Sequence, residues 1–356
     1  MNSFLEQYVE RITGLDIEAS RAEASHIGNL TVPPGALGKL ESLAVQLAGI
    51  TGDLKPSFPK REVIVMAADH GVCEEGVSAF PQEVTTQMIY NFLSGGAAVN
   101  VLARQAGAEV VCVDIGVNND LAHPSLLSRK IRCGTANMAK GPAMTREEAE
   151  LSIETGIRIV EEAVQRGVSI FVTGEMGIGN TTASAAVMCA LTNTEPRDAA
   201  GRGTGLDDER LKHKVSVIER ALELNAPDAS DPIDVLAKVG GLEIGGLTGV
   251  ILGAAANRCP VMIDGFISSA AALLARAISP EAAAFMIASH ASHEQGHRQL
   301  LQVLDLRPGL DLDMRIGEGT GGVLGLTLVD AACRIVSEMA TFESAGISGS
   351  GAAEQP

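Results

Sequence analysis

The apolar run VIVMAA, residues 63–68, passes directly into Asp69-His70-Gly71, and this pattern decides the fold class. The pattern recurs at Val110–Val113 before Asp114, at Val168–Val172 before Thr173-Gly174-Glu175, and at Val261–Ile263 before Asp264-Gly265. Near-continuous apolar strands separated by helices are typical of a parallel sheet that is covered on both faces. We therefore predict an α/β fold in which a Rossmann-like parallel sheet is flanked by helices.

Weaker copies of the pattern lie at Ala283–Ala288 and Leu312–Ile316. Apolar spacing near 3.6 predicts helices at Glu83–Ala106, Arg146–Arg166, Thr181–Leu191, Leu206–Leu224 and Gly322–Met339. In open parallel sheets, ligands bind beyond the carboxyl ends of the strands. Because the polar residues of the pattern fall at those ends, we expect one rim of the sheet to carry the functional site.

Both ends of the chain are helical in pattern and have no strand beside them. We expect residues 1–30 and 323–356 to form a smaller helical domain, and residues 31–322 to form the large α/β domain.

The composition excludes several classes of partner. With 27 Lys+Arg against 44 Asp+Glu, the 356-residue chain has a formal net charge of −17, which disfavours nucleic acid and anionic membranes. The longest charge-free apolar stretch, Ile244–Asn257, is too short to span a bilayer. The six cysteines lie far apart without a C-x-x-C pair, which indicates neither a disulfide framework nor a zinc site. We expect a cytoplasmic protein without a bound metal.

The segment Gly174–Thr182 (GEMGIGNTT) follows a predicted strand and opens a predicted helix. Glycines let backbone N–H groups approach an anion, so the segment is a candidate phosphate cradle, although it lacks the lysine of a Walker A loop. The alternative is a glycine-rich turn that only caps the helix. Arg202, in the glycine-rich loop Gly201–Gly205, could compensate locally for the acidic charge of the protein, or the loop could be an exposed cap.

The segment Gly317–Gly322 (GEGTGG) matches the G-x-G-x-x-G pattern of dinucleotide-binding folds. No further strand is predicted after the following helix, and Glu318 would place a carboxylate where a pyrophosphate must approach. A carboxylate between glycines at a strand end is better suited to act as a general base, because partial burial raises its pKa toward neutrality.

His290, His293 and His297 with Glu294 form a cluster for which we weigh two interpretations. The spacing could gather imidazoles for a metal, but hydrogen bonding at the strand end or a subunit contact is the commoner outcome. Asp69 and His70 could likewise form an acid/base pair, or Asp69 could only orient the neighbouring turn.

Taken together, the motifs resemble one family, the nicotinate-nucleotide:dimethylbenzimidazole phosphoribosyltransferases of cobalamin nucleotide-loop assembly. The matching segments, in chain order, are Pro34–Glu41, Ala68–Val72, Gly76–Thr85, Gly174–Thr182, Gly201–Gly205, Glu243–Gly246, Ile263–Phe266 and Gly317–Gly321. The resemblance implies transfer of the 5-phosphoribosyl group from nicotinate mononucleotide to 5,6-dimethylbenzimidazole, giving α-ribazole 5′-phosphate and nicotinate. It also implies a homodimer whose small helical domain is built from both termini.

The resemblance also assigns site residues. Glu318 matches the catalytic carboxylate and Glu175 matches a second acid in the same pocket. The phosphate and ribose are expected at Gly177, Ile178, Gly179, Asn180, Thr181, Arg202 and Gly203, and the base at Phe80, Gln87 and Met88. Some members have a small polar residue in place of Phe80 and Gln in place of Met88, so the preferred base is left open.

These residues suit an inverting displacement in which Glu318 removes the proton of the attacking benzimidazole. Nicotinate leaves from a cationic pyridinium donor, so we predict no cofactor and no magnesium requirement. Two alternatives from other classes are an NAD-dependent oxidoreductase, which needs Gly317–Gly322 to bind pyrophosphate, and a non-catalytic nucleotide-binding protein.

Overall fold

A parallel sheet of six strands organises the chain. In this computed structural model, which describes residues 1–203 and 205–348, the strand order is β3-β2-β1-β4-β5-β6. The strands are β1 (Arg61–Ala68), β2 (Glu109–Gly116), β3 (Leu127–Ser128), β4 (Ile170–Met176), β5 (Val261–Ile263) and β6 (Met286–Ala288). Every paired neighbour runs parallel, and the apolar residues of β1 from Val63 to Ala68 are fully buried. The predicted α/β fold with a parallel sheet is confirmed.

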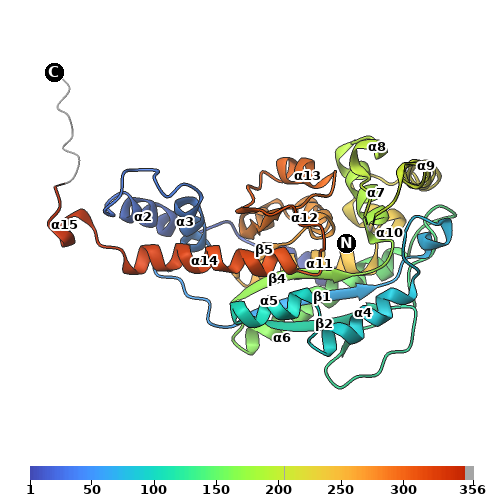
Figure 1. The fold of residues 1–356 in the computed structure, drawn as a ribbon, viewed down its shortest axis with the longest axis horizontal. Helices are drawn as coiled ribbons and strands as arrows, with labels where there is room; N and C mark the ends of the chain where they lie inside the picture. The colour runs from blue at the N-terminus through green and yellow to red at the C-terminus, as the bar shows by residue number, and fades with distance from the viewer. Residues whose placement is uncertain (204, 349–356) are drawn as a thin grey trace. The chain divides into compact units, whose positions relative to one another are not determined.

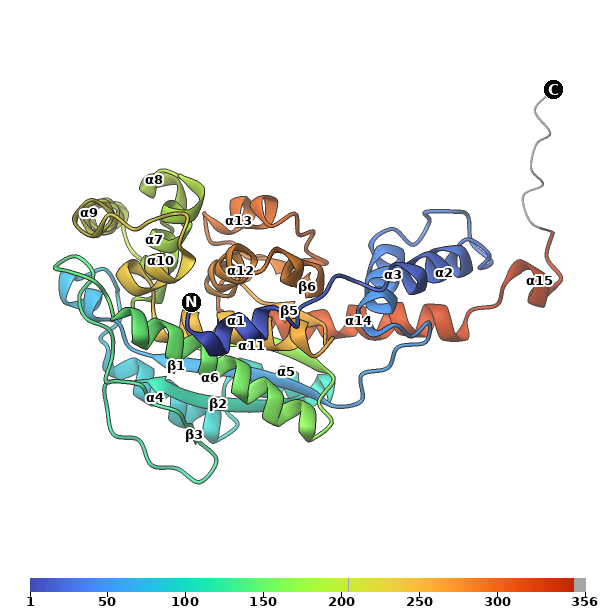
Figure 2. The same cartoon turned by 180° about the vertical axis from the view of Figure 1, so that it is seen from behind.

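Helices cover both faces of the sheet. Figure 1 shows α4 (Glu83–Leu93) and α5 (Ala98–Ala106) over β1 and β2, and Figure 2 shows α6 (Arg146–Gln165) on the opposite side with α11 (Leu242–Ala256). A Cβ on Gly156 of α6 would lie 2.0 Å from the carbonyl oxygen of Gly246 on α11. The two helices therefore meet backbone to backbone, and α11 is buried on all sides.

The remaining elements of this larger unit, which comprises Met1–Thr13 and Phe58–Gly325, surround the sheet. They are α1 (Ser3–Val9), η1 (Gly71–Glu75), α7 (Asn180–Thr192), α8 (Pro196–Ala199), α9 (Asp208–Asn225), α10 (Pro232–Val239), α12 (Phe266–Ile278), η2 (Pro280–Phe285), β7 (His290–Ala291), α13 (His297–Val303), β8 (Leu310–Asp311) and the start of α14 (Thr320–Glu338).

The smaller unit comprises Gly14–Ser57 and the described residues from Leu326 onward. It contains α2 (Ile17–Ile27), α3 (Lys39–Thr51), the rest of α14 and α15 (Phe342–Ala345). An antiparallel bridge between Leu30 and Thr341 joins its two chain segments. Thr204 and residues 349–356, the last part of the expected terminal domain, lie outside the described residues.

The units differ from the expected boundaries in two places. Helix α1 groups with the larger unit, because Leu5 and Tyr8 are buried and the Tyr8 hydroxyl accepts a 3.0 Å hydrogen bond from Asn257. Helix α3 groups with the smaller unit because it packs on α2, where a Cβ on Gly49 would lie 2.3 Å from the Ser20 hydroxyl.

Three secondary-structure predictions need correction. The helix predicted for Glu83–Ala106 is broken after Ser94, where Gly95 has a left-handed φ of 75°. The strand predicted at Ala283–Ala288 begins only at Met286, and the strand predicted at Leu312–Ile316 is irregular, since β8 ends at Asp311.

Helix α14 is, among described residues, the one helix long and apolar enough to cross a membrane, and half of its apolar window is buried in the structure.

Candidate active site

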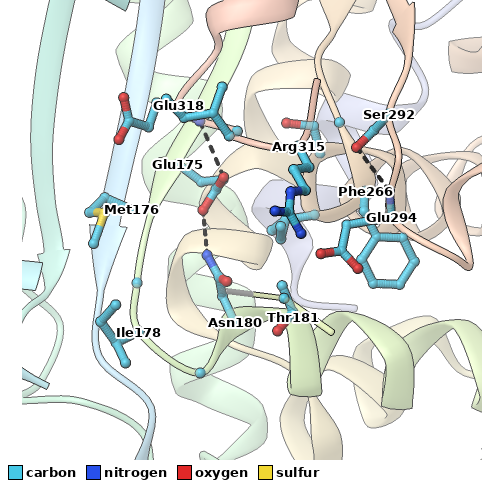
Figure 3. Close-up of a pocket in the computed structure, with 18 of the residues that line it drawn as sticks. Glu175, Met176, Ile178, Asn180, Thr181, Phe266, Ser292, Glu294, Arg315 and Glu318 are labelled. Atoms are coloured by element: carbon cyan, nitrogen blue, oxygen red, sulfur yellow. Dashed lines mark hydrogen bonds between the residues drawn. The ribbon is translucent and has the colours of Figure 1, made fainter. Parts of the chain in front are cut away.

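A cavity of about 140 Å³ opens at the carboxyl ends of β4 and β5 (Figure 3). Its lining includes both predicted acids, Glu175 and Glu318. All the residues predicted to bind phosphate and ribose also line it: Gly177, Ile178, Gly179, Asn180, Thr181, Arg202 and Gly203. Segments that are more than 100 residues apart in the chain thus meet at one rim of the sheet, as parallel-sheet topology requires.

The two acids are connected through the main chain. Glu175 is the last residue but one of β4, and its Oε1 accepts the backbone N–H of Glu318 at 3.3 Å. Its other oxygen accepts a hydrogen bond from the Asn180 side chain, at the start of α7. Glu175 therefore joins the loop that carries Glu318 to the loop that opens α7 (Figure 3).

Burial makes both acids weak. It raises the pKa of Glu175 to about 8, and repulsion from Asp264 adds to the effect. The pKa of Glu318 is raised to about 7 by the same two causes. One oxygen of Glu318 has no hydrogen-bond partner within the described structure, so this carboxyl group is available to a ligand.

The loop before α7 has the geometry expected of an anion cradle. Gly179 occupies the N-cap position with a left-handed φ of 96°, and the cavity lies at this N-terminal end of α7, which carries the positive end of the helix dipole. The N–H groups of Ile178, Asn180 and Thr182 donate within the protein, to the Thr85 hydroxyl and to the carbonyls of Gly177 and Gly179. A Cβ on Gly179 would lie 2.7 Å from the sulfur of Cys73, so no larger residue fits.

Lys214, on α9, supplies a positive charge that sequence reasoning missed. Its side chain is fully buried, and its Nζ donates to the Thr181 hydroxyl at 2.8 Å and to the Gly201 carbonyl at 3.1 Å. Desolvation lowers the pKa of Lys214 to about 8. The sequence carries one signal for it: Lys214 lies three and four residues before the buried Val217 and Ile218, on the apolar face of its helix.

Two arginines line the cavity and differ in their partners. Arg202 donates to the Leu206 carbonyl at 2.8 Å and pairs with Asp208, so its charge is already engaged. Arg315 extends into the cavity (Figure 3) and makes no hydrogen bond or ion pair with the described part of the chain. Arg315 was not selected from the sequence, because nothing there distinguishes it from other surface arginines.

The residues predicted to bind the base lie elsewhere. Phe80, which is 51% exposed, lines a neighbouring cavity of about 340 Å³ together with His70 and Gln82. Ser78 lines both cavities. Gln87 and Met88 follow on α4, exposed and half-buried respectively, and line neither cavity. Their assignment to the base stays a prediction.

The histidine cluster is organised by hydrogen bonds. The buried His297 accepts the N–H of Ser292 at 2.8 Å and lies 3.0 Å from the Ser269 hydroxyl, and burial lowers its pKa to about 3. His290 contacts the Ser289 hydroxyl at 3.0 Å, whereas His293 is exposed. Among the described residues, no three His, Cys, Asp or Glu side chains are placed to hold a metal ion. This arrangement favours the hydrogen-bonding interpretation.

Asp69 and His70 do not line the cavity that holds Glu318. His70 Nε2 lies 2.7 Å from Glu243 Oε1, and both side chains are buried. Although burial opposes it, the Glu243 carboxylate raises the pKa of His70 above its ordinary value. The pair lies beneath the anion cradle, since a Cβ on Gly177 would come within 3.4 Å of His70 Nε2.

Known proteins resemble this chain over nearly its whole length. A model of the phosphoribosyltransferase family matches residues 12–347. The Chloroflexus aggregans protein named nicotinate-nucleotide–dimethylbenzimidazole phosphoribosyltransferase is 56% identical to this chain over 347 residues. The match covers 97% of this chain and 98% of that protein. The Roseiflexus sp. RS-1 protein of the same name is 55% identical over 348 residues, covering 98% and 99%.

A crystal structure agrees with these relatives. The nicotinate-nucleotide-dimethylbenzimidazole phosphoribosyltransferase of Thermus thermophilus superposes with a TM-score of 0.89 at 46% identity, covering 94% of this chain and all of that one. The chain is thus an enzyme that belongs to the nicotinate-nucleotide:dimethylbenzimidazole phosphoribosyltransferase family.

Proposed function

We propose that this enzyme transfers the 5-phosphoribosyl group of nicotinate mononucleotide to 5,6-dimethylbenzimidazole in cobalamin biosynthesis, giving α-ribazole 5′-phosphate and nicotinate. One observation carries the proposal: a carboxyl group with a pKa of about 7, that of Glu318, shares a cavity with a helix N-terminus, and a buried lysine supports that helix end through Thr181. A phosphorylated sugar that is attacked by a weakly acidic heterocycle needs these groups together.

The donor phosphate fits at the start of α7. The Gly177–Thr181 segment lines the cavity at the positive end of the helix dipole, and the Lys214 charge lies directly behind Thr181. Arg315 is available for a second anionic group, the carboxylate of the nicotinate ring. Two anchors at the two ends of the donor would fix the anomeric carbon between them, which is how positioning lowers a barrier.

The chemical step is a displacement with inversion. One benzimidazole nitrogen gives its lone pair to C1′ of the ribose while the C1′–N bond to the pyridinium breaks, and that electron pair returns to the ring as neutral pyridine nitrogen. The proton on the other benzimidazole nitrogen passes to Glu318. With a pKa of about 7, Glu318 is half deprotonated at neutral pH and still basic enough to accept the proton.

Glu175 serves this step by position. It holds the backbone N–H of Glu318 and the amide of Asn180 at the same time, so it fixes the base relative to the phosphate site. Its pKa of about 8 keeps it largely neutral at pH 7. A neutral Glu175 adds no second negative charge beside Glu318 and therefore does not repel the anionic donor.

The two alternatives are disfavoured by separate observations. A dinucleotide-binding unit needs a strand after the helix that follows its glycine loop, whereas α15 is the one regular element after α14 in the described chain. A purely binding protein has no use for an unpartnered carboxyl oxygen beside the ligand, as at Glu318.

The test is a metal-free assay of the purified protein with both substrates, in the presence of a chelator. Nicotinate and α-ribazole 5′-phosphate are followed by chromatography, and we expect them in equal amounts. If the mononucleotide bound without either product forming, the function would be binding alone or transfer to another acceptor. The expected homodimer is checked separately by sedimentation.

A further inference from the structure

Asp264 is a buried carboxylate at the end of β5 that does not line the cavity. Its side chain is 1% exposed. Oδ2 accepts the backbone N–H of Gly319 at 3.1 Å, and Oδ1 accepts that of Gly322 at 2.8 Å. Its own N–H is held by the Thr173 hydroxyl at 3.2 Å. One buried side chain therefore accepts hydrogen bonds from both ends of the turn in which α14 begins.

These hydrogen bonds bear directly on Glu318, whose backbone is strained. Glu318 has a left-handed φ of 64°, and it stands between Gly317 at 76° and Gly319 at 87°. A residue with a Cβ adopts this conformation only when its surroundings impose it. Glu175 holds the N–H of Glu318, and Asp264 holds the next residue, so the two acids together impose the conformation that presents the Glu318 side chain to the cavity.

Asp264 also acts through its charge. Both of its oxygens accept N–H groups, which favours the ionised form, and His290 Nδ1 lies 3.9 Å from Oδ1. Burial opposes these contacts and raises the pKa of Asp264. After burial, repulsion from Asp264 is the next cause of the raised pKa values of Glu175 and Glu318. The remaining charged group of this cluster, Glu243 on α11, adds to the effect on Glu175.

We propose that Asp264 is a positioning residue of the transfer reaction: its two oxygens hold the turn that aims Glu318, and its charge helps Glu318 retain the proton it receives. The inference rests on the proposed role of Glu318 as the base. A role for Asp264 in the reaction can be told apart from a role in folding alone. If Asp264 only stabilised the fold, replacing it in a folded variant would leave the protonation of Glu318 unchanged.

The test compares the pH dependence of kcat in wild-type enzyme and Asp264→Asn. The amide keeps one acceptor oxygen, loses the other and carries no charge. We expect the acid limb of the profile to move to lower pH by about half a unit or more, kcat on the plateau to fall roughly tenfold, and the affinity for nicotinate mononucleotide to stay within about threefold. The matched control is Glu62→Gln. Glu62 is also buried but lies near the N-terminal end of β1, at the rim of the sheet away from the cavity, so its substitution should leave the acid limb where it is.

A second variant covers the case in which Asp264→Asn does not fold. Asp264→Glu keeps the charge but its extra methylene displaces the two hydrogen bonds, so we expect a lower kcat with the acid limb in place. A wild-type kcat in Asp264→Glu, or an unmoved limb in folded Asp264→Asn, would overturn the proposal.

A readout without turnover separates this inference from the proposed function. The ionisation of Glu318 is followed by infrared difference titration, its carboxyl band being identified by its loss in Glu318→Gln. A lowered Glu318 pKa in Asp264→Asn supports the effect of the Asp264 charge on Glu318 whether or not the wild-type protein turns over substrate, and an unchanged one contradicts the proposal even where the transfer reaction is established. Absence of turnover in the wild-type protein would overturn the proposed function and, with it, the role of Asp264 in the reaction.

Discussion

Glu175 Oε1 accepts the backbone N–H of Glu318 at 3.3 Å, so the two acids of the cavity are joined by the side chain of one and the main chain of the other. The second oxygen of Glu175 holds Asn180, at the start of the phosphate site. A single buried carboxyl group thus ties the proposed base to the proposed phosphate site, and the functions of these groups can be separated by substitution.

Replacing Glu318 by Gln should abolish most of the turnover. The amide has nearly the same shape but cannot take up a proton, and loss of a general base costs roughly 100- to 10,000-fold in rate. We expect kcat to fall within this range, while nicotinate mononucleotide binds with unchanged affinity in a calorimetric titration. A variant that kept wild-type kcat would remove Glu318 from the role of base.

The wild-type reaction should depend on pH in a direction fixed by Glu318. A base works only when deprotonated, so kcat should rise with pH up to about 7, with a slope of about one in the logarithm below that value. Above about pH 8, Glu175 loses its proton and a second negative charge appears in the cavity, so we expect a fall. The two limbs belong to the coupled pair. Rates measured across the range from about pH 5 to about pH 9 check this, and a flat profile would contradict it.

The substitution Lys214→Met should raise the KM for nicotinate mononucleotide. Lys214 acts on the phosphate site through Thr181, and loss of a hydrogen bond to a charged group costs about 2 kcal/mol, so we expect the KM for nicotinate mononucleotide to rise roughly 10- to 100-fold with a smaller change in kcat. Lys212→Met, on the exposed side of the same helix, is the control and should leave KM unchanged. Equal KM values in the two variants would place the phosphate elsewhere.

The same lysine predicts a pH effect on folding. The pKa of Lys214 is lowered from 10.5 to about 8 by burial, so between these values the unfolded chain binds a proton that the folded chain does not. The wild-type protein should therefore gain stability as pH rises from about 8 toward 10.5, and Lys214→Met should lose this gain. Urea unfolding at about pH 8 and about pH 10 measures both, and parallel behaviour of the two proteins would rule out the buried charge as the cause.

Arg315→Gln should weaken the use of nicotinate mononucleotide about tenfold in kcat/KM, because the unpartnered guanidinium is available to the donor. Nicotinamide mononucleotide, which has the phosphate but no ring carboxylate, serves as the comparison. A loss confined to the nicotinate compound assigns Arg315 to the carboxylate, and an equal loss with both would assign it to the phosphate. Arg298→Gln, which removes an exposed pair with Asp311, is the control.

Much of this fold is readable from the sequence for a simple reason. The apolar runs before Asp69, Glu175 and Asp264 are nearly continuous, and strands of a sheet that is buried on both faces need apolar side chains at successive positions. Parallel strands bring their carboxyl ends to one rim, so the placement of Glu175 and Asp264 at the same rim follows from the pattern. Glu318 reaches that rim from an irregular segment, because the strand predicted at Leu312–Ile316 does not form. The short pairing of β7 with β8 does not, because two residues carry no periodicity.

The remaining parts of the site depend on long-range packing. Lys214 reaches Thr181 only because α9 lies against α7, and no local rule predicts which helices are neighbours. Asp264 was recognised as a strand end, but its grip on Gly319 and Gly322 joins residues more than 50 positions apart. Gly95-Gly96 marks the break between α4 and α5 in the sequence, but apolar spacing alone predicts one continuous helix through it.

The contact between α6 and α11 also indicates where this enzyme can be redesigned. Gly156 on α6 and Gly249 on α11 leave no room for even one added carbon, because a Cβ on either would lie 2.0 Å from a carbonyl oxygen of the facing helix, so a library that varied these two positions would mostly sample misfolded chains. Phe80, Gln87 and Met88 lie at the other extreme, partly or fully exposed and outside this packed layer. Substitutions at these three positions should therefore leave the scaffold intact, so a library there would test the prediction that they bind the base.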